Sequence, residues 1–259
     1  MYLSRIQLKE SIGQNSQLGL LLKDRSYGIH RLLHDLFSDG DRFLFREEIS
    51  NEQVSTSRSA PMYYTFSRTE PDTDSVIFDV NTKRFDPDVK AGDKLMFRLR
   101  ANPTISKSVE GKRHSIRHDI AMNTQREFLI SECQSRGLEF ELSKRGMITA
   151  LRSHQDYHGA QGYQQLQNAM EIRMNNAAKD WLIKRGDKYG FTIEFNQLQA
   201  TGYRWNALPE KSRNAGFSSI DYEGVLTVTN AAYFLDKLVQ GIGPSKAFGC
   251  GLMMIKRVN

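Results

Sequence analysis

The chain has 259 residues, a length that suits two small domains or one large one. Its hydrophobic fraction of 39% can form an ordinary core, and it has neither a signal peptide nor an apolar run long enough to cross a membrane. The formal net charge of +6 and the isoelectric point near 9.2 favour a polyanionic partner. The two cysteines, Cys133 and Cys250, are too few for a disulfide framework and suit buried thiols in a reducing, cytoplasmic compartment.

The first part of the chain reads as short strands around one amphipathic helix. Strands are predicted at 2–8, 43–47, 62–67 and 94–100, and a helix at 26–37. The helix has apolar residues at positions i, i+3, i+4, i+7 and i+8 from Ile29, which form one face. This order is consistent with a βαββαβ ferredoxin-like unit whose second helix is poorly marked.

The second part can repeat this topology, although no sequence repeat is visible. Helices are predicted at 124–136, 161–184 and 231–240, and strands at 138–142, 191–198, 219–229 and after residue 251. Residues 202–216 read as a basic loop, and residues 104–119 as a linker or an RNA-facing loop. We therefore predict an α+β fold with an N-terminal unit at 1–103, a basic linker at 104–119 and a C-terminal unit at 120–259.

A glycine-rich segment near the C-terminus is the most informative motif of the chain. Glycines stand at 241, 243, 249 and 251, and Lys246 and Lys256 add positive charge. Glycine permits positive φ and close approach of a ligand, so the backbone N–H groups can cradle a phosphate. The spacing fits neither a Walker loop nor a Rossmann fingerprint. The alternative is a structural turn between a helix and an edge strand.

Several segments, taken together and in order, resemble one family. They are GIGPSKAFGCGLM from residue 241, and the stretches 1–6, 27–37, 95–103 and 222–228. The sequence is thereby similar to the CasE (Cse3) family, the crRNA-processing endoribonucleases of type I-E CRISPR systems, within the repeat-associated RNA-binding superfamily. The resemblance implies two tandem ferredoxin-like domains and a CRISPR repeat hairpin as substrate. It also implies metal-independent cleavage on the 3′ side of the stem, with a 2′,3′-cyclic phosphate and a 5′-OH as products. After cleavage the protein is expected to stay on the hairpin and join the other Cascade subunits.

Histidine is the side chain best suited to such chemistry. The RNA supplies its own nucleophile, the 2′-OH, so cleavage needs a base and an acid, and histidine with its ordinary pKa near 6.5 can serve as either. The resemblance matches His30 to the family's general acid/base and Tyr27 to its active-site tyrosine. A cation must offset charge on the phosphorane. Lys23, Lys211, Arg213 and Lys246 are candidates between which the sequence does not choose. Without the resemblance, His30 reads as a half-buried surface residue, and His34 reads as its neighbour.

The six histidines form three pairs with i, i+4 spacing, at 30/34, 114/118 and 154/158, which raises the question of a metal site. No third ligand is recognisable, and the chain lacks both an HExxH motif and the paired carboxylates of two-metal nucleases. We therefore expect neither a metal nor a cofactor.

Basic and glycine residues make up the predicted RNA-binding surface, with aromatic residues such as Trp205 among them for stacking. The predicted residues are Arg98, Arg100, Lys112, Arg113, Arg117, Arg204, Lys211, Arg213, Gly241, Gly243, Lys246, Gly249 and Gly251. The simpler alternatives are a solvated strand face for the arginines and a core anchor for Trp205. The alternative function is a non-catalytic RNA-binding scaffold subunit of a CRISPR effector complex.

Overall fold

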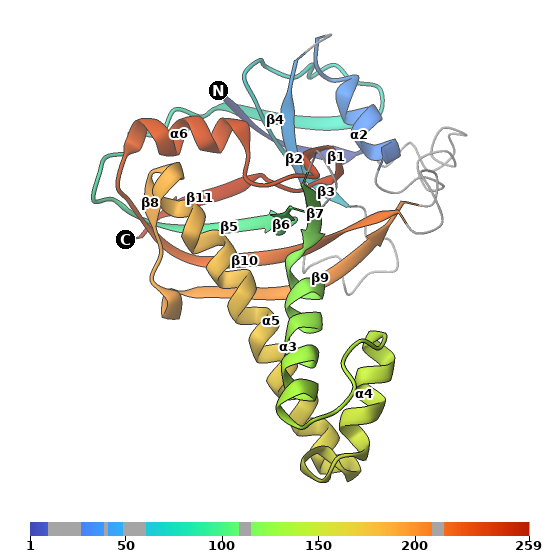
Figure 1. The fold of residues 1–259 in the computed structure, drawn as a ribbon. Coiled ribbons are helices and arrows are strands. Elements are labelled where there is room, and N and C mark those ends of the chain that lie inside the picture. Colours follow the sequence, from blue (N-terminus) through green and yellow to red (C-terminus); the bar gives the residue numbers. More distant parts are fainter. Residues whose placement is uncertain (10–26, 39–40, 49–60, 109–114, 209–214, 259) are drawn as a thin grey trace.

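The computed structural model describes residues 1–9, 27–38, 41–48, 61–108, 115–208 and 215–258. Two antiparallel sheets with helices lie side by side, and a long helical extension projects from the second sheet (Figure 1). The predicted α+β class and its two ferredoxin-like units are confirmed. In the part of the chain that is described, no helix is both long and apolar enough to cross a membrane.

The first unit is a four-stranded sheet with one helix on its face. Its strand order is β2-β3-β1-β4, and every neighbouring pair is antiparallel. The elements are β1 (Tyr2–Leu8), α2 (Tyr27–His34), β2 (Phe43–Glu48), β3 (Met62–Ser67) and β4 (Phe78–Arg84). The apolar face of α2 packs Ile29 and Leu33 against Ile6 and Phe45, which excludes water from this side of the sheet. The poorly marked second helix is absent, since residues 68–77 form irregular structure.

The second unit is a larger sheet with the order β11-β5-β10-β8, in which β9 also pairs with β10. Its helices α5 and α6 cover one face, where Leu99 of β5 joins Trp181 and Phe234 in the largest core of the molecule. The elements are β5 (Lys94–Ala101), α5 (Gly159–Tyr189), β8 (Phe191–Thr192), β9 (Leu198–Ala207), β10 (Gly216–Val228), α6 (Ala231–Gln240) and β11 (Met253–Arg257).

The predicted domain boundary is wrong for the strand at 94–100. β5 pairs with β10 and β11, so it opens the second unit, and the first unit is closed by the unpredicted edge strand β4. The predicted linker contains a hairpin of β6 (Thr104–Lys107) and β7 (Ile116–Asp119). Alternation identifies a strand, but it does not identify the distant strand with which it pairs.

Three helices between β7 and β8 form the extension seen in Figure 1, namely α3 (Ile120–Ser135), α4 (Lys144–Ser153) and α5. They have a separate core around Leu129, Met147 and Leu166. The strand predicted at 138–142 is wrong, because Leu138 and Leu142 instead pack against this helical core.

Two further predictions in the second unit need correction. The strand predicted at 191–198 is broken after β8 by a 3₁₀ turn, η3 (Phe195–Gln197). The loop predicted from residue 202 is strand β9 as far as Ala207. The prediction of buried free thiols at Cys133 and Cys250 is confirmed.

The two units are joined by apolar packing and by a shared carboxylate. Leu44 and Phe66 of the first sheet belong to the core of the second unit. Asp221 of β10 accepts two hydrogen bonds from Arg100, at 3.0 and 2.9 Å, and lies 3.4 Å from the guanidinium of the buried Arg46 of β2. Because these contacts are partly shielded from water, they fix the position of one sheet relative to the other.

Candidate active site

A cavity of about 850 Å³ lies where the two units meet. Helix α2 and the start of β2 line it from the first unit, and the end of α6 and the glycine-rich segment line it from the second. Its lining residues include five basic side chains and one carboxylate, Asp41. The basic residues are His30, His34, Arg42, Arg68 and Lys246. We call this the His30 cavity.

Phenylalanines of β2 hold the His30 ring in place. The imidazole is stacked on Phe43 with ring centroids 5.3 Å apart, and the neighbouring Phe45 ring is tilted against it at 5.9 Å. Both rings belong to the buried core beneath α2. Burial, and then repulsion from His34, lower the pKa of His30 from its ordinary value of 6.5. His30 is therefore a neutral imidazole at neutral pH, able to accept a proton.

Backbone hydrogen bonds within the glycine-rich segment fix its shape. Ile242 N–H donates to the carbonyl of Gly251 at 2.9 Å, and Gly251 N–H donates to the carbonyl of Arg100 at 2.7 Å. Ser245 is the one non-glycine residue with positive φ, 62°, among the residues described, and Asn102 donates a hydrogen bond to its hydroxyl at 2.8 Å. This strained position begins the 3₁₀ turn η4 (Lys246–Phe248), which contacts both α2 and β2.

The segment brings one cation, Lys246, into the His30 cavity. Partial burial, and then repulsion from Lys237 and Arg42, lower the pKa of Lys246. Asp41, the one carboxylate among the described residues that line the cavity, already accepts a hydrogen bond from Thr69 at 2.7 Å. The cavity thus gathers positive charge with little internal compensation, an arrangement that favours an anionic ligand such as a phosphodiester.

The buried glycines of this segment contact protein. Gly241, Gly249 and Gly251 are buried, and a contact between RNA and their backbone stays a prediction. A Cβ on Gly241 would lie 2.7 Å from Leu44 Cδ2, and a Cβ on Gly249 would lie 3.4 Å from Phe45. These glycines let the segment pack against β2, and what they position is Lys246. Gly243 is only partly buried.

The two predicted arginines of β5 differ in their availability. Arg100 donates to Asp221 and to the Glu47 carbonyl, so its charge already has a partner between the units. Arg98 pairs with Glu223 at 3.2 Å, but 59% of its side chain is exposed. Arg98 therefore remains the candidate of this pair for a contact with RNA.

Two hairpins of the second unit carry another group of predicted residues. Tyr203 of β9 donates a hydrogen bond to Asp119 of β7 at 3.5 Å, and burial followed by the charge of Asp119 raises the pKa of Tyr203 to about 12. Arg117 and Arg204 are exposed, and the Trp205 side chain is 51% exposed, which rules out the core-anchor interpretation. We call the β6–β7 and β9–β10 pairs the paired hairpins.

Several predicted residues lie outside the described part of the chain. They are Lys23, Lys112, Arg113, Lys211 and Arg213, together with His114 of the second histidine pair. Tyr27 is the first residue of α2, and its side chain is also outside the description. Among the residues described, no group of three or more His, Cys, Asp or Glu side chains could hold a metal ion.

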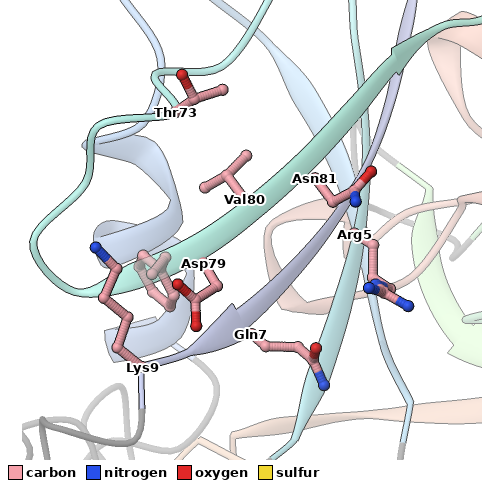
Figure 2. A pocket seen from close by; sticks show the side chains of 8 residues that line it. Arg5, Gln7, Lys9, Thr73, Asp79, Val80 and Asn81 are labelled. Atoms are coloured by element: carbon pink, nitrogen blue, oxygen red, sulfur yellow. The ribbon is translucent and has the colours of Figure 1, made fainter.

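A second, smaller hollow of about 280 Å³ follows the edge of the first sheet. Figure 2 shows Arg5 and Gln7 of β1 beside Asp79 and Asn81 of β4. Its lining, as far as the residues are described, contains no histidine or cysteine and shares no residue with the His30 cavity. Sequence patterns had indicated nothing here, and the side chains offer no acid–base pair suited to catalysis.

Fold and cavity together define a tandem ferredoxin-like protein with a groove of basic side chains between its units. The chain belongs to the CRISPR associated protein family, whose profile matches residues 1–257. A 43-residue stretch is 40% identical to the CRISPR system Cascade subunit CasE of Escherichia coli K12, which is 17% of this chain and about a fifth (22%) of that protein.

Solved structures of related proteins have the same fold. Thermus thermophilus Cse3, bound to an RNA representing a pre-cleavage complex, matches with a TM-score of 0.61 and 21% identity over 98% of both chains. Cas6e of Escherichia coli K-12 matches with a TM-score of 0.56 and 22% identity over 100% of both chains. The predicted resemblance to the CasE (Cse3) family is confirmed.

Proposed function

We propose that this protein is an endoribonuclease that binds the CRISPR repeat hairpin and cleaves the precursor transcript to give mature crRNA. The observation that carries the proposal is the His30 cavity, where an imidazole held by Phe43 and the cation Lys246 line one groove. Membership of the CRISPR associated protein family supports a repeat transcript as substrate. The names of its relatives, a Cascade subunit and the endoribonuclease Cse3, point the same way.

The cavity supplies what metal-independent cleavage requires. The 2′-OH loses its proton and attacks the adjacent phosphorus, the P–O5′ bond breaks, and the products carry a 2′,3′-cyclic phosphate and a 5′-OH. His30 transfers a proton in this step, and Tyr27 from the start of α2 orients the sugar or the phosphate. Of the four candidate cations, Lys246 is the one that lies in the described part of the chain, where it lines the cavity. It offsets the charge of the phosphorane.

The paired hairpins fit the binding step. Exposed Arg117 and Arg204 suit phosphates of the hairpin stem, and Trp205 suits stacking on an unpaired base. After cleavage the protein keeps the 3′ hairpin and takes its place with the other Cascade subunits. Slow product release then limits the enzyme to a single turnover.

The test is cleavage of the repeat hairpin by the purified chain in excess EDTA at fixed ionic strength. We expect one cut at the 3′ base of the stem, at the same rate in EDTA and in Mg²⁺, with a cyclic phosphate that acid opens. Tight binding without cleavage would favour the scaffold subunit instead. Loss of cleavage in EDTA, restored by one particular metal ion, would contradict the acid–base mechanism.

A further inference from the structure

Helix α2 places two imidazoles in one cavity. His30 and His34 are one helical turn apart, both line the His30 cavity, and their ring centroids are 6.4 Å apart. Both rings lie near the same aromatic side chain, Phe43, with centroids at 5.3 Å for His30 and 6.3 Å for His34. The other described histidines, His118, His154 and His158, are not among the residues of this cavity.

Attack by a 2′-OH needs two proton transfers at different oxygens. O2′ must lose its proton as it attacks phosphorus, and O5′ must gain one as the P–O5′ bond breaks. These oxygens lie on opposite sides of the phosphorus in an in-line displacement, so a single imidazole does not serve both in one step. We infer that His34 is a second catalytic residue, the general acid that protonates O5′, while His30 is the base that accepts the O2′ proton. The inference rests on the proposed function and goes beyond it.

The positions of the two rings decide which is the acid. His30 packs on Phe43 and Phe45, and burial lowers its pKa, so the neutral form that accepts a proton is favoured. His34 is the last residue of α2, one turn further along the helix, and its ring lies farther from Phe43 than that of His30. The other charged groups that line the cavity, in the part of the chain that is described, are Asp41, Arg42, Arg68 and Lys246. Proton balance holds, since His30 ends the step protonated and His34 ends it neutral.

A modified substrate separates the acid from the base. In a repeat RNA with sulfur in place of the bridging O5′ at the cleavage site, the thiolate leaves without being protonated. With the natural RNA, both His30→Ala and His34→Ala should slow single-turnover cleavage by roughly 10²–10⁴-fold. With the 5′-thio RNA, His34→Ala should cleave within about tenfold of the unmodified protein, whereas His30→Ala should stay slow. His158→Ala, a change at an exposed histidine without a side-chain cap bond, is the matched control.

Other results would overturn the assignment. If His34→Ala cleaves the natural RNA at the normal rate, His34 has no part in the mechanism. If His34→Ala is slowed equally on the natural and the 5′-thio RNA, His34 is not the general acid. If the 5′-thio RNA restores cleavage by His30→Ala and not by His34→Ala, then His30 is the acid and His34 is the base. His34→Gln, checked by circular dichroism and hairpin affinity, covers the case in which the alanine variant fails to fold.

The pH profile gives a second readout. The unmodified protein should show a bell-shaped rate profile, and His34→Gln should lose the alkaline limb alone; loss of the acidic limb instead would contradict the assignment. If the unmodified protein leaves the natural repeat intact, the proposed function fails, and this inference with it. If it cleaves and only His34 proves dispensable, the proposed function stands and this inference fails.

Discussion

The His30 cavity and the paired hairpins both present basic side chains, but in different surroundings. In the cavity, the imidazoles are held against buried phenylalanines, and burial lowers the pKa values of His30 and Lys246. On the hairpins, Arg117, Arg204 and Trp205 lie exposed on two strand pairs linked through Asp119. The difference separates two tasks, since constrained groups suit proton transfer and exposed arginines suit phosphate contacts.

The largest effect is expected at the centre of the cavity. His30→Ala removes a proton-transfer group, so single-turnover cleavage should fall by roughly two to four orders of magnitude while hairpin affinity barely changes. The measurement is a rate at saturating protein together with a dissociation constant from filter binding. Cleavage near the normal rate would show that His30 takes no part in the chemistry, and the cavity would then not differ from the paired hairpins in function.

A smaller loss is expected from Lys246, the cation that the glycine-rich segment brings into the cavity. Lys246→Met keeps most of the side chain but removes the charge, and it should slow cleavage by about 10²-fold, the scale of losing one donor to a developing oxyanion. Lys256→Met, at an exposed lysine of β11, is the matched control. If both variants cleave normally, another cation completes the site.

The glycine-rich segment should connect stability to catalysis. Gly241→Ala places a methyl group 2.7 Å from Leu44 Cδ2 at a φ of 76°, so it should both destabilise the protein and shift Lys246. Gly137→Ala is the control, because its φ is 65° but nothing lies within 4 Å of the added carbon. The control should lose about 1–2 kcal/mol of unfolding free energy, the usual cost of a left-handed residue, without any change in cleavage. Gly241→Ala should lose more, as measured by urea unfolding. Equal losses, with cleavage intact, would leave the segment no role in placing Lys246.

The smallest effects are expected on the hairpins. Arg117→Ala and Arg204→Ala should each weaken hairpin binding severalfold and reduce the salt slope by roughly 0.7–0.9 units, one phosphate contact each, with the cleavage rate of the bound RNA unchanged. Affinity titrations from low to moderate salt measure this. Unchanged slopes would place Arg117 and Arg204 on a solvated face.

The two arginines of β5 should differ from each other. Arg98→Ala should weaken binding and reduce the salt slope in the same way, whereas Arg100→Ala should destabilise the protein, because it leaves Asp221 without its bidentate partner. An unchanged slope for Arg98→Ala would place that arginine on a solvated face.

Local sequence patterns predicted much of the fold, and long-range pairing accounts for most of what they missed. The apolar face from Ile29 gave α2, and α6 lies at the predicted residues. β5 alternates as predicted, but its partners are more than a hundred residues away in β10 and β11. β4 was missed because it is a largely exposed edge strand rich in polar residues. At 138–142 apolar and polar residues alternate as they do in a strand, but Leu138 and Leu142 pack into a helical core instead.

The candidate site was partly predictable for a related reason. His30 and Tyr27 lie in one short helix, so a local motif indicated them. The selection of Lys246 needed the fold, because only the packing of Gly241 and Gly249 against β2 brings that lysine beside α2. Phe43 gave no signal in the sequence beyond that of an ordinary core residue. Its role as the support of both histidine rings appears only when β2 and α2 are packed together.

The helical extension has a consequence for the order of assembly. It separates β5 from β10 in the sequence, and a flexible connection of that length would add to the entropy of closing the sheet. Helices α3 and α5 pack against each other, so they bring the two ends of the insertion together locally. At the base, the Trp181 indole N–H and Arg185 both donate to the carbonyl of Thr104. Evolution could therefore lengthen or shorten the tip of this insertion while its base, and the strand pairing beyond it, stayed unchanged.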